Sequence, residues 1–464
     1  MMTTRKKALV TVVAVILLLF VAALAYALSP SQTRAIPAPA AEGGATAADQ
    51  AALVQAGAYV AAASDCIACH TAPGGKPYAG GRPVHSPIGN MYSTNITPDK
   101  ATGIGNYTLE QFDRAIRHGI RRDGDSLYPA MPYPSYAKMT DQDIRALYAF
   151  FMQGGVQPVN ADNRQNDIRW PLSIRWPVAI WRKTFAPPDM APLRLDKYQS
   201  AALARGAYLV QGPGHCGTCH TPRAVTMQER ALDESGNEFL AGGPLIDGWR
   251  AVNLRGDKVD GLGAWTEKDI MDTLRTGRNG ATAVVGGPMN DVVAHSMQFM
   301  NDNDLLAIAT YLKSLPATGA GKSSFSPDPR TTQMLNSGQD RDNRAAQLYL
   351  DNCNACHRSD GHSNRITFPA LPNNPTVLAD DPTSLIRLVL AGSRLPSTRV
   401  RPSDLAMPGF GWRLSDEETA QLVTFVRNGW GNHASEVSAS QVARVRKAIK
   451  EDGGVEMDER TSSR

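Results

Sequence analysis

Cysteine occurs at six positions of this 464-residue chain, and all six lie in three copies of one pattern, Cys-x-x-Cys-His. The copies begin at Cys66, Cys216 and Cys353. Three familiar uses of thiol pairs explain them poorly. A chain this long buries a core without disulfide staples, zinc-binding pairs usually lie only ~15–20 residues apart, and a redox pair needs no histidine.

Covalent haem attachment explains both the spacing and the histidine. Two thiols one helical turn apart can form thioethers with the two vinyl groups of one porphyrin, and the next residue then ligates the iron. The sequence therefore predicts three covalently bound haems c. We expect attachment at Cys66 and Cys69, Cys216 and Cys219, and Cys353 and Cys356, with His70, His220 and His357 as proximal iron ligands.

The N-terminus predicts export. Arg5, Lys6 and Lys7 precede an uncharged apolar run over residues 8–28, which is about long enough to span a bilayer. Ala25-Tyr26-Ala27 resembles a cleavage site, so residues 1–35 are interpreted as a membrane anchor, which we favour, or a cleaved signal peptide. In both cases the remainder lies outside the bacterial cytoplasm, where haem c is attached. Residues 35–49 are rich in Pro, Ala and Gly, which predicts a flexible tether.

A longer repeat surrounds the thiol pattern. The helix before the first two copies contains Gly-Ala-Tyr, and each repeat has a closing amphipathic helix that we expect to begin at Thr140, Asn301 and Ser415. Helices at both ends of each repeat and almost no alternating strand pattern predict an all-α fold of three tandem haem domains. The expected domains are residues 50–155, 196–318 and 339–434.

The remaining segments are expected to lie outside these domains. Residues 156–195 form a Trp- and Pro-rich connector, for which interdomain packing is favoured over docking on a partner or membrane interface. Residues 319–338 read as a linker. Residues 435–464 read as a polar tail in which residues 440–450 can form one short basic helix.

The sixth iron ligand separates an electron carrier from a catalyst. Met131 and Met407 lie in Pro-containing loops before the closing helices, which favours them as distal ligands. The second repeat offers Met289, Met297 and Met300. Met289 follows Gly-Gly-Pro and is favoured, with Met297 second. His118 and His215 are interpreted as surface or propionate-contacting groups.

Several longer stretches, among them GRPVHSPIGNMYSTNITPDKATGIG and GPGHCGTCHTPRA, resemble the three-haem cytochrome c subunits of membrane-bound periplasmic dehydrogenases that oxidise alcohols, aldehydes or sugar acids such as gluconate. The resemblance covers nearly all of residues 51–432. It implies three tandem cytochrome c domains, with His70 and Met131, His220 and Met289, and His357 and Met407 as axial pairs.

The resemblance also implies a function. Electrons would pass from a separate catalytic subunit of quinoprotein, flavoprotein or molybdenum type, through the haems, to ubiquinone in the inner membrane, and the chain itself would contribute no catalytic residue. The alternatives are a free-standing periplasmic carrier or terminal-oxidase subunit and, less favoured, a multihaem peroxidase. A net charge of +4 over this length gives no reason to expect a nucleic-acid partner.

Overall fold

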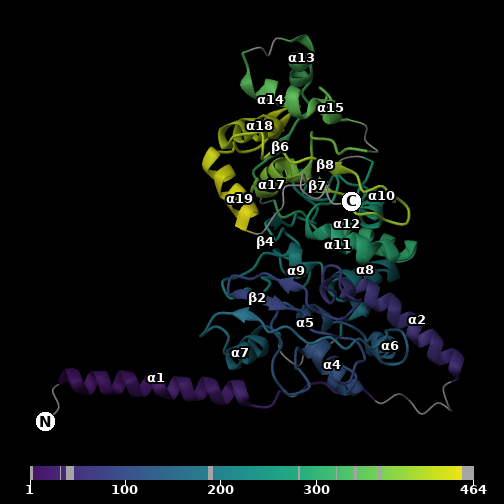
Figure 1. Ribbon diagram of the computed structural model, residues 1–464, viewed down its shortest axis with the longest axis vertical. Coiled ribbons are helices and arrows are strands. Elements are labelled where there is room, and N and C mark those ends of the chain that lie inside the picture. Colours follow the sequence, from purple (N-terminus) through teal and green to yellow (C-terminus); the bar gives the residue numbers. More distant parts are fainter. Residues whose placement is uncertain are drawn as a thin grey trace. The chain divides into compact units, whose positions relative to one another are not determined.

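The computed structural model describes residues 4–31, 33–37, 46–186, 192–280, 283–319, 321–338, 342–363 and 367–451 (Figure 1). The chain divides into two compact units. Unit 1 comprises Met1–Ala61 and Cys69–Leu193, and unit 2 comprises Ala62–Ala68 and Arg194–Arg464. The second and third expected domains thus fall together in unit 2. The described residues are mainly helical with a few short antiparallel strands, which confirms the all-α prediction.

Unit 1 holds most of the first repeat and both N-terminal helices. Its helices are α1 (Thr4–Leu28), α2 (Ala47–Ala63), α3 (Cys66–Cys69), α4 (Leu109–His118), α5 (Tyr133–Tyr136), α6 (Asp141–Met152) and α7 (Trp176–Phe185), of which α2 and α3 run partly into the segment assigned to unit 2. Strands β1 (Pro83–Val84), β2 (Gly89–Tyr92) and β3 (Asp167–Ile168) form an antiparallel sheet in that order.

The second repeat lies in unit 2. Its helices are η1 (Leu195–Lys197), α8 (Ala201–Gln211), α9 (Gly217–His220), α10 (Glu267–Thr276), α11 (Pro288–His295), η2 (Met297–Phe299) and α12 (Asp302–Ser314). Strands β4 (Leu245–Ile246) and β5 (Trp249–Arg250) form a hairpin.

The third repeat follows in the same unit. Its elements are β6 (Ser324–Phe325), α13 (Arg330–Ser337), α14 (Arg344–Asn352), α15 (Asn354–His357), α16 (Pro375–Leu378), α17 (Thr383–Ala391), β7 (Ser393–Arg394), β8 (Ala406–Met407), α18 (Asp416–Asn428), β9 (Asn432–His433) and α19 (Ala439–Glu451). Strand β7 pairs with β8, and β6 pairs with β9.

The predicted helix starts are confirmed by their caps. The side chains of Thr140, Asn301 and Ser415 accept hydrogen bonds from the third backbone N–H of α6, α12 and α18, which satisfies a donor that would otherwise be unpaired. The closing helix then crosses the first helix of its repeat. A Cβ atom on Gly57 or Gly206 would collide with a carbonyl oxygen of α6 or α12, so only glycine permits these two crossings.

Two expected segments outside the third domain belong to it instead. Helix α19 was expected in a polar tail, yet Val442, Val445 and Ile449 are buried in the core of the third repeat. These three residues form an apolar stripe on a helix whose other side chains are charged, polar or alanine, and that stripe explains the packing. Residues 452–464 lie outside the described part.

The expected linker over residues 319–338 also contributes structure. Ser324 and Phe325 pair with His433 and Asn432, and Leu335 of α13 is part of the same core. A segment rich in Ser, Gly and Pro therefore supplies the first strand and first helix of the third repeat.

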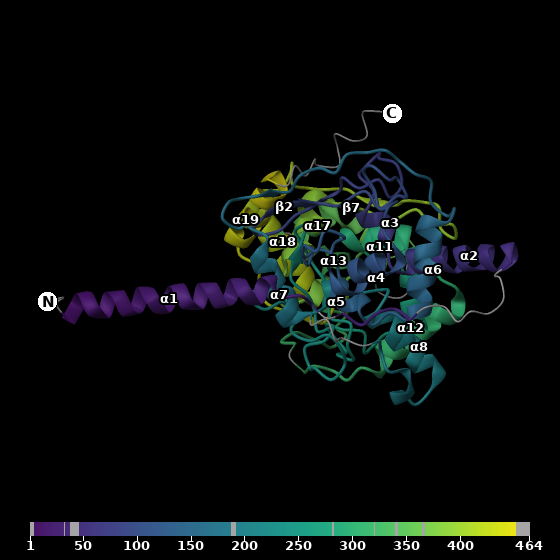
Figure 2. The ribbon, with the colours of Figure 1, turned by 90° about the horizontal axis from the view of Figure 1, so that it is seen from below.

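Helix α1 is attached to unit 1 at its C-terminal end only, and Figures 1 and 2 both show the rest of it running outward from α7. Residues Lys7–Leu28 have a mean hydropathy of 3.1 and are long enough to cross a membrane. The ammonium of Lys183 in α7 donates to the carbonyl oxygens of Tyr26 and Ser29 at 2.5 and 2.7 Å. The Tyr26 carbonyl belongs to the last turn of α1 and also accepts from the Ser29 hydroxyl at 2.8 Å, so Lys183 and Ser29 together cap the end of α1.

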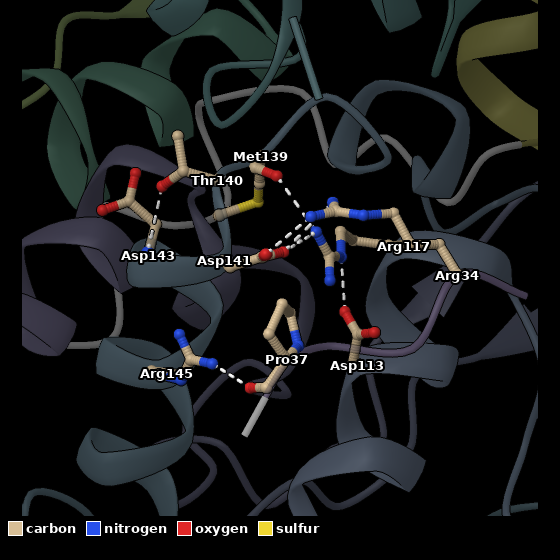
Figure 3. A network of polar contacts seen from close by, with 9 residues as sticks. All are labelled: Arg34, Pro37, Asp113, Arg117, Met139, Thr140, Asp141, Asp143 and Arg145. Carbon is tan, nitrogen blue, oxygen red and sulfur yellow. Dashed lines mark hydrogen bonds and ion pairs between the residues drawn. The ribbon is translucent and has the colours of Figure 1, made fainter. Parts of the chain in front are cut away.

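The chain that follows α1 is also bound to unit 1 (Figure 3). The Arg34 guanidinium donates to both carboxylate oxygens of Asp141, at 2.8 and 3.3 Å, and the Pro37 carbonyl accepts from Arg145. The expected tether over residues 35–49 therefore starts as an attached segment. Its middle lies outside the described residues, and α2 occupies its end.

Candidate functional site

Each thiol pair lies on a single helical turn. Helix α3 spans the first pair, while α9 and α15 begin directly after Cys216 and Cys353. The N–H groups of His220 and His357 donate to the carbonyls of Cys216 and Cys353 at 2.9 Å. This turn places the two sulfurs on one side of the backbone and the histidine directly after them. All six cysteines are present as thiols rather than disulfides.

The first thiols of the second and third pairs lack the property that a redox nucleophile needs. Burial, reinforced by the neighbouring thiol, raises the pKa of Cys216 and of Cys353 to about 12. A catalytic Cys-x-x-Cys pair requires the opposite shift, because its nucleophile is the thiolate. Among the residues that the structure describes, no group of three or more His, Cys, Asp and Glu side chains is placed to hold a bare metal ion.

The three motif histidines share one orientation. Nδ1 of His70 lies 2.7 Å from the carbonyl oxygen of Thr94, and Nδ1 of His220 lies 2.7 Å from that of Val252. Nδ1 of His357 lies 3.3 Å from the carbonyl oxygen of Pro369. A carbonyl oxygen only accepts, so Nδ1 carries the proton in each ring. Nε2 then presents its lone pair, as a metal-ligating imidazole must.

Burial keeps these rings in the ligating form. It lowers the pKa of His70, His220 and His357 below the usual value, although the hydrogen bond to the backbone carbonyl opposes the shift in each case. The imidazoles are therefore neutral near pH 7, and a neutral ring is the form that binds iron.

Sequence reasoning missed the carbonyl acceptors, although the repeat contains a sign of them. Thr94 and Val252 directly precede the asparagines of the related stretches NITPDK and NLRGDK. Asn95 and Asn253 are nearly buried, and each accepts a hydrogen bond from the backbone N–H two residues further on, at 2.9 and 2.8 Å. This asparagine turn fixes the backbone whose preceding carbonyl orients the histidine.

Met131 and Met289 occupy matching positions in the first two repeats. Helices α4 and α10 each end at a glycine of positive φ, Gly119 at 61° and Gly277 at 76°. The chain then turns back, and a backbone N–H donates to the carbonyl of Gly119 and of Gly277 at 2.8 Å in each case. Met131 and Met289 each lie four residues after the residue that donates. The two donors are Leu127 and Val285. Met289 differs from the expectation only in lying within the first turn of α11 rather than in a loop.

Met300 occupies a core position instead. The residue before the cap of the closing helix is buried in every repeat, with Met139 at 0%, Met300 at 4% and Leu414 at 5% exposure. Leucine cannot ligate iron, so this position serves packing. Met297 is buried to the same extent in η2, whereas Met289 is only partly buried.

Met407 is held by a strand. Met407 in β8 pairs with Ser393 in β7, and β7 begins two residues after the end of α17. Gly392 lies between these elements with φ of 72°, and a Cβ atom there would collide with the Met407 carbonyl. The Asn290 amide, next to Met289, donates to the carbonyl of Arg394 in β7 at 2.8 Å. The candidate distal segments of the second and third repeats are thus hydrogen-bonded to one another.

His118 is buried, which corrects the surface interpretation. Only 3% of it is exposed, and Arg182 of α7 covers it by donating to its carbonyl oxygen at 3.5 Å. Burial, assisted by nearby arginines, lowers the pKa of His118 to about 4. The ring is therefore neutral near pH 7.

The residues present fit haem c. Each repeat provides two thiols on one helical turn and a neutral histidine whose Nε2 lone pair is available, which are the protein groups that thioether attachment and proximal ligation need. The expected distal methionines remain predictions at Met131, Met289 and Met407.

Comparison with known proteins agrees with this fit. Residues 54–154 and 343–430 match the cytochrome c family. The chain is 51% identical to the gluconate 2-dehydrogenase cytochrome c subunit of Pantoea cypripedii over 85% of this chain and 90% of that protein. It is 53% identical to the cytochrome c subunit of the quinone alcohol dehydrogenase of Gluconobacter oxydans, over 85% and 82%. The fructose dehydrogenase cytochrome subunit of Gluconobacter japonicus is 39% identical, over 86% and 83%.

The fold and the attachment turns thus define a cytochrome c, a protein that transfers electrons through covalently bound haem c. More particularly, the chain belongs to the family of cytochrome c subunits of gluconate and alcohol dehydrogenases.

Proposed function

We propose that this chain binds three haems c and relays electrons from a separate catalytic dehydrogenase subunit to ubiquinone at the periplasmic face of the inner membrane. The observation that carries the proposal is the repeated proximal arrangement. A thiol pair on one turn is followed by a histidine whose Nδ1 is bonded to a backbone carbonyl, and this occurs at His70, His220 and His357.

The residues of each repeat would hold one haem in such a relay. When bound, haem c supplies an iron that accepts and passes on one electron. The backbone carbonyl fixes the imidazole tautomer, and the buried surroundings exclude charge from the ring. We assign Met131, Met289 and Met407 as the distal ligands, because a thioether closes the sixth position to peroxide and raises the reduction potential.

A retained α1 fits this role. The run Lys7–Leu28 corresponds to about 33 Å of helix, slightly more than the ~30 Å hydrocarbon core of a bilayer. Cleavage after Ala27 would remove carbonyls that Lys183 caps, and Ala27 is itself buried at 7% exposure. These contacts favour the anchor over the cleaved signal peptide.

The haem count and the direction of transfer can be tested together. The purified native complex should give three haems per chain by pyridine haemochrome, and Cys216→Ala with Cys219→Ala should reduce the count to two. Substrate of the catalytic subunit should reduce the haems in the complex, and a short-chain ubiquinone should reoxidise them.

The isolated chain provides the control. Loaded with haem, it should be reduced by dithionite but not by gluconate, ethanol or acetaldehyde. Direct reduction by one of these substrates would refute the proposed division of labour, and rapid peroxide turnover would favour the peroxidase alternative.

A further inference from the structure

Exposed large apolar side chains are unevenly distributed over the described residues of unit 1. Outside α1, the exposed large apolar side chains of the described part of unit 1 are Trp170, Leu172 and Ile174, which are 81%, 54% and 38% exposed. These three lie within residues 170–175, the segment that leads into α7, here called the Trp170 loop. An apolar cluster of this kind on an otherwise polar unit marks a contact surface.

The contacts of α7 define where this loop lies along α1. At one end, the Trp176 ring meets the Phe20 ring edge to face, with centroids 5.7 Å apart. At the other end, Lys183 caps the carbonyls of Tyr26 and Ala27. Lys183 lies seven positions after Trp176, and Ala27 lies seven positions after Phe20. Helix α7 therefore runs parallel to the last two turns of α1.

The contacts between α7 and α1 indicate how deep the Trp170 loop would lie in a bilayer that α1 spans. Phe20 lies eight residues before the end of α1 at Leu28, or about 12 Å along the helix axis. If α1 crosses the bilayer, Lys183 lies at its outer surface and Trp176 lies toward the hydrocarbon. The Trp170 loop leads directly into Trp176, so we place it at about the same level.

Two of the three arginines near the loop, Arg175 and Arg182, are turned into the protein, whereas Arg169 is exposed directly before Trp170. The Arg175 guanidinium stacks on the Tyr128 ring at 4.2 Å and donates to the carbonyl of Ser126, so its charge is directed into the protein. Arg182 is 3% exposed and donates to the hydroxyl of Ser31, just beyond α1. Tryptophan and arginine beside an apolar span are the residues that anchor proteins at the membrane interface.

We infer that the Trp170 loop inserts into the outer leaflet of the bilayer that α1 spans, so that unit 1 rests directly on the lipid surface. The inference rests on the proposed anchoring by α1. It differs from interdomain packing and from a protein docking surface, because it commits the three exposed side chains to lipid.

The test uses the full chain, loaded with haem and reconstituted in nanodiscs of phosphatidylcholine and phosphatidylglycerol. Phospholipids that carry a diazirine either near the headgroup or at the end of the acyl chain are photoactivated, and the labelled peptides are identified by mass spectrometry. We expect the acyl-chain probe to label residues 170–176, which lie near the level of Phe20, as well as the centre of α1.

Two variants make the result specific. Replacing Trp170, Leu172 and Ile174 together by serine should lower labelling of the loop by about tenfold, because apolar burial holds it in lipid, and should leave labelling of α1 unchanged. Lys100→Ser, at an exposed position of the same unit, should change neither.

The outcomes separate this inference from the proposed function. Labelled α1 with an unlabelled loop would overturn the lipid contact and leave the anchor intact. An unlabelled α1 would overturn the anchor itself. Loop labelling that disappears when the catalytic subunit is added would assign the loop to protein docking and would also overturn the inference.

Discussion

Two methionines of the second repeat should respond to truncation in opposite ways. Met300 is 4% exposed in the core, so Met300→Ala removes buried volume that neighbouring side chains only partly refill. Such changes cost about 2–5 kcal/mol of unfolding free energy, which for a unit of this size lowers the melting temperature by roughly 5–15 °C. The haem ligation of the second repeat should remain unchanged.

Met289→Ala should show the reverse pattern. The side chain is only partly buried, so the loss of packing should be smaller, while loss of the sixth ligand should lower the reduction potential of one haem and shift its iron toward high spin. Near-infrared magnetic circular dichroism detects His–Met ligation directly, and thermal unfolding of the same samples gives the stability. Intact ligation in Met289→Ala, or lost ligation in Met300→Ala, would refute the equivalence of Met289 with Met131. If Met297→Ala rather than Met289→Ala abolishes His–Met ligation, Met297 is the distal ligand of the second repeat.

Three further perturbations test other parts of unit 2. Burial alone would raise the pKa of Glu234, but hydrogen bonds led by that from Lys197 outweigh it and lower the pKa from 4.5 to about 2. This carboxylate therefore stabilises the fold above pH 4.5, and the contribution is lost as the pH falls toward 2. Glu234→Gln should be less stable than the parent by about 1–2 kcal/mol at pH 7, with a gap in denaturant midpoint that closes in acid. Ile449→Ala should cost about 2–5 kcal/mol if α19 belongs to the core, and an unchanged midpoint would restore the tail interpretation. Asn290→Ala should cost about 0.5–1.5 kcal/mol with three haems retained, and a loss of haem would contradict its assignment as a link between repeats.

The repeated and capped parts of the fold were predictable from the sequence. Thr140, Asn301 and Ser415 combine a cap residue with an apolar period, and both signals are local. The attachment turns were equally predictable, because the spacing of two thiols and a histidine leaves few physical alternatives.

Other parts depend on distant contacts that the sequence does not encode locally. Helix α19 has only three large apolar residues on one face, and these are buried only because the rest of the core of the third repeat packs against them. His118 lies in a charged stretch that is typical of a surface, yet Arg182 of α7, more than sixty residues later, covers it. The carbonyls that orient the motif histidines are backbone atoms, so the asparagines that follow two of them, Asn95 and Asn253, are their only local sign in the sequence.

The pairing of β6 with β9 has a consequence for the order of events in biosynthesis. A chain emerges N-terminus first, whether from a ribosome or from a translocation pore, so Ser324 and Phe325 must wait for Asn432 and His433 before the third repeat can close. The thiols of Cys353 and Cys356 emerge well before that. In the closed repeat, burial raises the pKa of Cys353 to about 12, whereas an exposed thiol ionises near pH 8.5. The interval between emergence and closure is therefore when the Cys353 sulfur is most reactive, and the length of chain between Cys353 and β9 contributes to its duration.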